Sequence, residues 1–205
     1  MKQKHIVIIG GGYAGLMCAI RLAGKSRRIK PKITLINGTD VFIERPRLHE
    51  SATNIDVQRK PILDMLKGTG VEFIQAWVKA ISPTQKTVTI EEQTIDYDYL
   101  VYAIGSKINT GTVSGIEEHA YILHPYGDNS AEALRQRLLD YQSRDGKVIV
   151  VGSGATGIEG AGHIKSIYPH LDVTIVTAGD FAKFKGEHIQ KHIQSAMMEQ
   201  GIHVI

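Results

Sequence analysis

The fold of this chain is decided by the stretch Ile6-Val7-Ile8-Ile9-Gly10-Gly11-Gly12-Tyr13-Ala14-Gly15. Its apolar residues predict a strand, its glycines have the spacing G-x-G-x-x-G, and residues 13–23 continue with apolar side chains at helical spacing. In such a turn the first glycine makes the bend, the second lets the backbone approach a diphosphate, and the third lets the helix pack on the strand. The amino end of the helix adds partial positive charge. The stretch therefore predicts a dinucleotide-binding turn.

The same pattern returns in the second half of the chain. An apolar strand leads into Gly152, Gly154 and Gly157, and a helix and a second strand at 172–177 follow. One such turn is weak evidence for a nucleotide site, because glycine-rich turns also serve plain packing, whereas two copies in matching contexts are strong evidence. Two dinucleotides on one chain favour hydride transfer between a nicotinamide and a flavin, which the cofactors perform and the protein orients.

The order of elements predicts an α/β fold with two Rossmann-like units built on parallel sheets, the second of them incomplete. A strand at 32–36 completes the first βαβ unit, and an apolar strand at 99–104 joins it. Short strands separated by turn residues predict an inserted antiparallel meander, at 71–78, 87–90 and 94–96. The glycine-rich stretch 109–127 reads as a loop and sets the boundary between domains 1–112 and 113–205. Further elements are expected as helices at 130–141 and 186–200 and a strand at 202–205.

Composition excludes several classes of function. The content of 42% hydrophobic and 22% charged residues is typical of globular proteins, and the net charge of +3 is scattered, which gives no support to nucleic-acid binding. The single Cys18, for which its neighbours indicate a core position, allows neither an internal disulfide nor a cysteine-paired redox centre. His188 and His192 have a metal-chelating spacing but lack a third ligand, so we expect a solvated helix face and no metal. Without a spanning segment or a signal peptide, we expect a cytoplasmic protein, soluble or peripheral to a membrane.

These motifs together resemble the pyridine-nucleotide/flavin oxidoreductases, specifically the type II NADH dehydrogenases and the apoptosis-inducing-factor-like flavoproteins. The resemblance runs across the whole chain and assigns FAD to the first turn and NAD(P)H to the second. Tyr97 to Ser106 is similar to the strand and turn that close over FAD, and Glu44 to Glu50 falls beside the flavin. The FAD contacts that the resemblance implies are Gly10, Gly12, Tyr13, Ala14, Gly15, Asn37, Arg45, Pro46, Val78, Ala103, Ile104 and Gly105. Those implied for NAD(P)H are Gly152, Gly154, Ala155, Thr156, Gly157 and Thr177.

Glu159 matches a family carboxylate near the nicotinamide and flavin rings, which makes it the candidate catalytic residue; a solvated or capping helix residue is the alternative. The sequence also departs from the family pattern. Asn37 stands where a carboxylate normally binds the adenosine ribose, so its amide can accept one hydroxyl without charge assistance, and Asp40 is an alternative partner. Thr177 replaces an acidic residue that would favour NADH, and the cations that could meet a 2′-phosphate are Lys183 and Lys185, so the choice between NADH and NADPH stays open. Threonine is frequent in relatives where this chain has Ile104.

The resemblance implies an enzyme that passes a hydride from NAD(P)H to FAD and then electrons to a quinone-like or other acceptor. The missing cysteine pair argues against a disulfide reductase. The chain lacks the family's later segments, which return to the FAD domain and supply dimer or membrane contacts, so we expect a truncated piece of a longer protein that retains FAD weakly and has little activity. The alternative is a non-catalytic dinucleotide sensor or interaction module.

Overall fold

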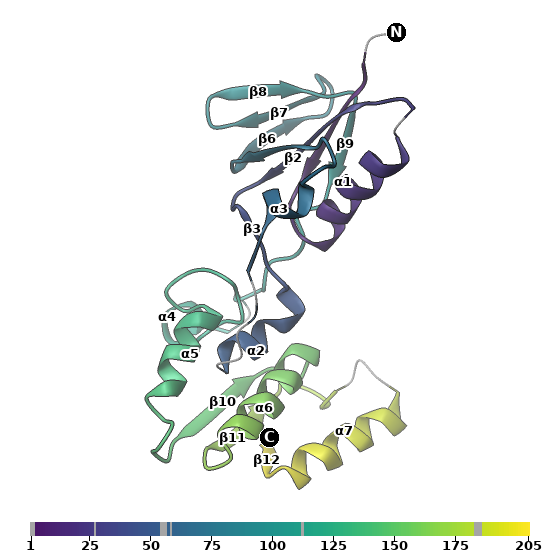
Figure 1. Ribbon diagram of the computed structural model, residues 1–205. Helices are drawn as coiled ribbons and strands as arrows, with labels where there is room; N and C mark the ends of the chain where they lie inside the picture. Colours follow the sequence, from purple (N-terminus) through teal and green to yellow (C-terminus); the bar gives the residue numbers. More distant parts are fainter. Residues whose placement is uncertain (1–2, 27, 54–56, 58, 112, 183–185) are drawn as a thin grey trace. The chain divides into compact units, whose positions relative to one another are not determined.

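The chain forms two compact units in the computed structural model, which describes residues 3–26, 28–53, 57, 59–111, 113–182 and 186–205. The first unit comprises Met1–Glu44 and Gln58–Ile108, and the second comprises Arg45–Val57 and Asn109–Ile205. The α/β fold class is as the sequence predicts, with parallel and antiparallel sheets (Figure 1). The assignment of 1–112 to FAD and 113–205 to NAD(P)H remains a prediction. By its contacts, the segment Arg45–Val57 belongs to the second unit.

The first unit is built on a parallel sheet of four strands in the order β5-β2-β1-β9. The strands are β1 (His5–Ile9), β2 (Lys32–Asn37), β5 (Glu72–Gln75) and β9 (Tyr99–Tyr102). Helix α1 (Tyr13–Lys25) connects β1 to β2, which pair in parallel, so the predicted βαβ unit is confirmed. The glycine turn between β1 and α1 therefore lies at the carboxyl edge of the sheet, where ligands bind in open α/β folds.

Strand alternation gives this sheet two apolar faces. Ile8 and Leu35 are fully buried in one cluster with Leu16 of α1, whereas Val7 and Ile36 are fully buried in another, against the antiparallel strands. Successive side chains of a strand point to opposite faces, which explains why residues 7 and 8 belong to different clusters. Each such burial stabilises the fold by about 1.5–3 kcal/mol. The carboxyl edge is thus held by packing on both sides.

The antiparallel meander differs in one strand from the sequence prediction. It consists of β6 (Val78–Ser82), β7 (Thr87–Ile90) and β8 (Gln93–Asp96). The stretch 71–78 was expected to form its first strand; instead β5 pairs in parallel with β2 and ends at Gln75, and β6 begins at Val78. The last bond of the parallel pairing is donated by the Ala76 N–H to the Asn37 carbonyl. Smaller elements of the unit are β3 (Val41–Phe42), β4 (Lys60–Pro61) and α3 (Ile62–Leu66).

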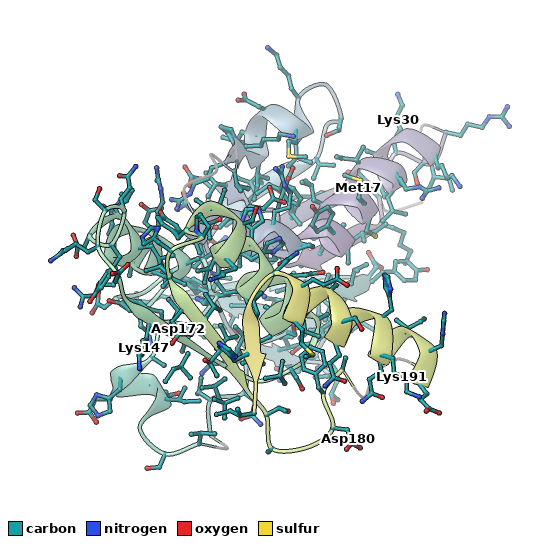
Figure 2. All side chains as sticks on the ribbon, turned by 90° about the horizontal axis from the view of Figure 1, so that it is seen from below. Met17, Lys30, Lys147, Asp172, Asp180 and Lys191 are labelled. Atoms are coloured by element: carbon teal, nitrogen blue, oxygen red, sulfur yellow. The ribbon has the colours of Figure 1, made fainter. Side chains whose placement is uncertain are left out.

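The second unit repeats the opening layout. Its strands β10 (Lys147–Val151), β11 (Asp172–Val176) and β12 (Ile202–Val204) are parallel and lie in the order in which they occur. Figure 2 labels Lys147 and Asp172, the register partners that begin β10 and β11. Helices α6 (Ala155–Ile167) and α7 (Glu187–Glu199) connect the strands and contribute to one buried cluster with them. The other face of β10 leaves Ile149 (66%) and Val151 (55%) exposed.

The remaining elements of the second unit are short. They are the 3₁₀ turn η1 (Arg45–Arg47) and the helices α2 (Leu48–Ala52), α4 (Ile116–His119) and α5 (Ala131–Leu139). Neither α2 nor α4 was predicted from the sequence. Helix α2 contacts α5 and α6. Helix α4 lies inside the expected loop 109–127 and begins after Gly115, which is in the left-handed region (φ 82°). Ser130 caps α5 by accepting from the Ala133 N–H. Within the described ranges, no helix is both long enough and apolar enough to cross a membrane.

Candidate dinucleotide-binding turns

The first turn requires glycine at two positions for packing. Gly10 has φ 105°, a left-handed conformation that favours glycine, and its N–H donates to the Ile36 carbonyl at 2.8 Å. A Cβ there would lie 2.2 Å from the Ala103 carbonyl oxygen, and a Cβ on Gly15 would lie 1.9 Å from the Gly10 oxygen. Because no side chain fits at these separations, glycine at position 10 lets Ala103 approach the turn, and glycine at position 15 lets helix α1 approach the end of β1.

Gly12 has the opposite surroundings. It precedes the first residue of α1 with extended backbone angles, and a Cβ there would meet nothing within 4 Å. Gly12, Tyr13 and Ala14 are exposed, and the first turn of α1 contains no acidic residue. The amino end of the helix therefore presents N–H groups and uncompensated positive charge to open space, the arrangement that binds phosphate groups. The residues present fit the diphosphate of a dinucleotide.

Asn37 braces the turn from the end of β2. Its Oδ1 accepts from the Gly11 N–H at 2.8 Å, and its Nδ2 donates to the carbonyl and the hydroxyl of Thr39, at 2.8 and 3.2 Å. Nδ2 is thus bonded to Thr39, and Oδ1, which has two lone pairs and accepts one hydrogen bond from Gly11, has the capacity to accept one more. Asp40, the alternative ribose partner, is exposed.

The other candidate FAD residues of the first unit lie where two strands end or begin. The Ala103 N–H donates to the Ile9 carbonyl, which extends the pairing of β9 with β1. Ile104 and Gly105 follow in exposed positions, Gly105 with φ 74°, and half-buried Val78 begins β6. Ala103 to Gly105 thus leave the sheet at the edge that carries the glycine turn.

The second turn repeats this geometry. Gly152 has φ 109° and its N–H donates to the Val176 carbonyl at 2.8 Å, and a Cβ on Gly157 would lie 2.1 Å from the Gly152 oxygen. Gly154 has extended backbone angles, and a Cβ there would meet nothing within 4 Å. Ala155 and Thr156 are exposed, and no acidic residue occupies the first turn of α6. The second turn therefore fits a diphosphate for the same reasons as the first.

Thr177 occupies the position that corresponds to Asn37. Its hydroxyl lies 2.8 Å from the Ser153 hydroxyl, and its N–H donates to the Ile205 carbonyl. Neither group adds a charge that would favour or oppose a 2′-phosphate. The two lysines that could supply a cation, Lys183 and Lys185, lie outside the described residues.

Glu159 lies on α6 among side chains from α2. Its side chain is 57% exposed, and its Oε2 lies 4.0 Å from Nδ1 of His49. The two imidazole rings of His49 and His163 meet edge to face, with centroids 5.3 Å apart. Arg45 and Pro46 stand exposed in the adjoining turn η1. The structure thus brings the predicted catalytic carboxylate into the same unit as the segment 45–50.

His163 is held by a hydroxyl from α2. Its Nδ1 lies 2.5 Å from the hydroxyl of Thr53, a residue that is 1% exposed. The same hydroxyl lies 3.1 Å from the carbonyls of His49 and Glu50. A hydroxyl has one hydrogen, so when Thr53 donates to a carbonyl, Nδ1 of His163 must be the donor. Burial, and then the charge of His49, lower the pKa of His163, while Glu50 opposes the shift.

The sequence did not predict that His49 lies near Glu159 or that His163 contacts Thr53 and the His49 ring. The available signal was spacing: Glu159 and His163 are four residues apart on one helix face, as are His49 and Thr53 on the facing segment. Across the described part of the chain, no group of three or more His, Cys, Asp or Glu side chains is arranged to hold a metal ion. On α7, Lys191 (Figure 2) pairs with Glu187 at 2.7 Å.

Comparison with known proteins agrees with the repeated turns. The family model described as pyridine nucleotide-disulphide oxidoreductase matches residues 4–205. A type II NADH:quinone oxidoreductase of Staphylococcus aureus is 28% identical over 180 residues, which are 82% of this chain and 45% of that protein. NDH2 from Plasmodium falciparum, solved with NADH, superposes with a TM-score of 0.80 at 20% identity, over 100% of this chain and 48% of that one. The sulfide:quinone oxidoreductase of Aquifex aeolicus superposes with a TM-score of 0.79 at 24% identity, over 98% of this chain and 50% of that one.

The two solved structures share the fold of this chain, which spans about half the length of the relatives that it matches. The family model covers nearly every residue, including both glycine turns. The chain belongs to the pyridine nucleotide-disulphide oxidoreductase family.

Proposed function

We propose that this chain is part of a flavoprotein that passes a hydride from NAD(P)H to FAD and then electrons to a quinone-like or other acceptor. The observation that carries the proposal is the repeated turn, open to a diphosphate at Gly12 and again at Gly154. Two sites of one kind in one chain fit a reaction between two dinucleotides. Family membership and the quinone and NADH in the names of the relatives support the same chemistry.

In the first unit, the backbone at Gly12 and Tyr13 would hold the FAD diphosphate, with the positive end of α1 behind it. Asn37 would accept one ribose hydroxyl through the free lone pair of Oδ1 while its Nδ2 stays bonded to Thr39. The remaining contacts in this unit would come from backbone groups at Val78 and Ala103 to Gly105. Arg45 and Pro46, which the resemblance also implies for FAD, belong to the second unit. FAD, when bound, supplies the two-electron chemistry.

In the second unit, the turn at Gly154, Ala155 and Thr156 would hold the NAD(P)H diphosphate, and Gly157 would keep α6 close to β10. Thr177 would meet the adenosine ribose with a hydroxyl that already contacts Ser153. Glu159 is the candidate catalytic residue, because it combines an exposed carboxylate with an imidazole at 4.0 Å that can bear a proton.

The acceptor is proposed to be a quinone-like small molecule. The named relatives in Staphylococcus aureus and Aquifex aeolicus use quinones, and Cys18 is the single cysteine of these 205 residues, so they contain no dithiol for the electrons. We propose a position peripheral to a membrane together with this acceptor.

The experiment is anaerobic reduction of the full-length protein. We expect a yellow protein whose flavin absorbance bleaches on addition of NADH or NADPH and returns on addition of a soluble quinone. A colourless protein that stays colourless with excess FAD would refute the proposal. A nucleotide-dependent rise in Tm without any diaphorase turnover would instead support a non-catalytic dinucleotide sensor.

A further inference from the structure

The only tryptophan of the chain is exposed to solvent near the first glycine turn. Trp77 follows β5, and its side chain is 69% exposed, although burial of an indole contributes substantially to stability. One side of the ring lies on Gly38, where a Cβ would come within 2.3–2.5 Å of three ring atoms. Gly38 has no positive φ, so its lack of a side chain is explained by the ring and not by the backbone.

Trp77 is joined to the turn by a short series of contacts. The Gly11 N–H donates to the Asn37 side chain, Asn37 precedes Gly38, and the indole lies on Gly38. The Ala76 N–H donates to the Asn37 carbonyl at 2.9 Å, which fixes the backbone directly before Trp77. The ring therefore has a fixed base on the sheet and an exposed surface at the carboxyl edge.

We propose that Trp77 is an aromatic platform on which the adenine base of the dinucleotide in the first unit stacks. The proposal rests on the proposed function and extends it to a residue that determines base specificity. A dinucleotide half contains diphosphate, ribose and base in that order, and the structure presents the open turn at Gly12, the Asn37 side chain and the Trp77 ring in the same order. Every base has a π-face, but the larger purine covers more of an indole, so adenine is favoured over a pyrimidine.

The test uses the emission of Trp77 in the 205-residue chain, in which it is the single tryptophan, so that the emission reports on this site alone. ADP is the probe, since it carries the base, ribose and diphosphate but no flavin that would quench the indole by energy transfer. We expect ADP to quench Trp77 emission saturably, UDP to quench it less at equal occupancy, and inorganic pyrophosphate to leave it unchanged. Occupancy is measured independently by calorimetry.

Two variants separate stacking from general damage. Trp77→Ala should weaken ADP binding by about tenfold, the loss of one base–aromatic stack, whereas Trp77→Phe should retain most of the affinity. Gly38→Ala keeps the indole but places a methyl group in its position, so ADP affinity should fall and the quenching should disappear. Ile29→Ala, which removes a side chain of the same unit that is 77% exposed, is the control and should bind ADP normally.

The outcomes separate this inference from the proposed function. Full affinity of Trp77→Ala for FAD and ADP would overturn the platform and leave the flavoprotein proposal standing. ADP that binds the wild type without changing the indole emission would have the same meaning. Absence of any FAD or ADP binding in the full-length protein would overturn both. An emission shift that depends on protein concentration and not on ADP would show that Trp77 serves a protein contact instead.

Discussion

The side-chain oxygen of Asn37 accepts the N–H of Gly11 at 2.8 Å, so the residue expected to bind ribose also holds the glycine turn in shape. Gly11 is buried, and water cannot easily replace this partner. An unpaired buried N–H costs about 1–3 kcal/mol. We therefore expect Asn37→Ala to lower the free energy of unfolding of the first unit by about that amount and to weaken FAD binding.

The measurement is urea unfolding together with a titration of FAD. Asn109→Ala is the matched control, because Asn109 also accepts a backbone N–H, that of Gly111 at 3.1 Å, but in an exposed loop. We expect its effect to stay within about 0.5 kcal/mol. Equal losses in the two variants would contradict a bracing role for Asn37.

Substitution of two glycines of the first turn should have different effects, one on FAD affinity and the other on stability. Gly12→Ala places a methyl group in open space with backbone angles that suit alanine, so stability should stay within about 1 kcal/mol while FAD affinity falls about tenfold or more. Gly15→Ala forces a Cβ against the Gly10 oxygen and should destabilise the unit by at least about 1–3 kcal/mol.

Unfolding and FAD titration of both variants test this pair. Gly24→Ala serves as the control. Gly24 lies near the end of the same helix, and a Cβ there would meet nothing within 4 Å, so this substitution should lower neither stability nor FAD affinity. A Gly12→Ala protein that binds FAD as tightly as the wild type would remove the turn from the binding site.

The stability of the second unit should depend on pH through His163. Burial and the charge of His49 lower its pKa from 6.5, so the folded state prefers the neutral ring. The unfolded chain then binds more protons below about pH 6.5, and stability, present above that pH, is lost as the pH falls toward the lowered folded value.

Urea unfolding between about pH 5 and about pH 8 measures this slope, and imidazole NMR signals report the titration directly. His163→Gln, which can still hydrogen-bond Thr53 but cannot be protonated, should flatten the profile above the range in which carboxylates titrate. An unchanged slope in this variant would show that another group is responsible.

Glu159→Gln should separate binding from turnover in the full-length enzyme. If the carboxylate moves or holds a proton during hydride transfer, its neutral isostere should lower kcat by about 100-fold while dinucleotide binding changes little. Stopped-flow reduction of the flavin by NADH measures the step. Glu187→Gln on α7, an exposed carboxylate paired with Lys191, is the control; a Glu159→Gln enzyme with normal flavin reduction would leave Glu159 as a solvated helix residue.

The two turns were predictable because their constraints are local. A glycine that must bend the chain or admit a helix is visible in the residue type and spacing, and both sets of contacts are found. The departure at 71–78 was not predictable from alternation alone, since the pairing of β5 with β2 depends on a register between distant segments. The contact of Thr53 with His163 joins residues 110 positions apart. The contact of the Trp77 ring with Gly38 likewise joins segments that are distant in the sequence.

Ile149 and Val151 of β10 turn two aliphatic side chains toward solvent, while Val148 and Val150 of the same strand pack on the core. Aliphatic groups gathered on a strand favour association between molecules at high concentration. We therefore expect this 205-residue polypeptide to scatter light and precipitate at a lower protein concentration than a protein of the same charge with a polar strand surface. Ile149→Lys would be a simple means of keeping it dispersed for spectroscopy.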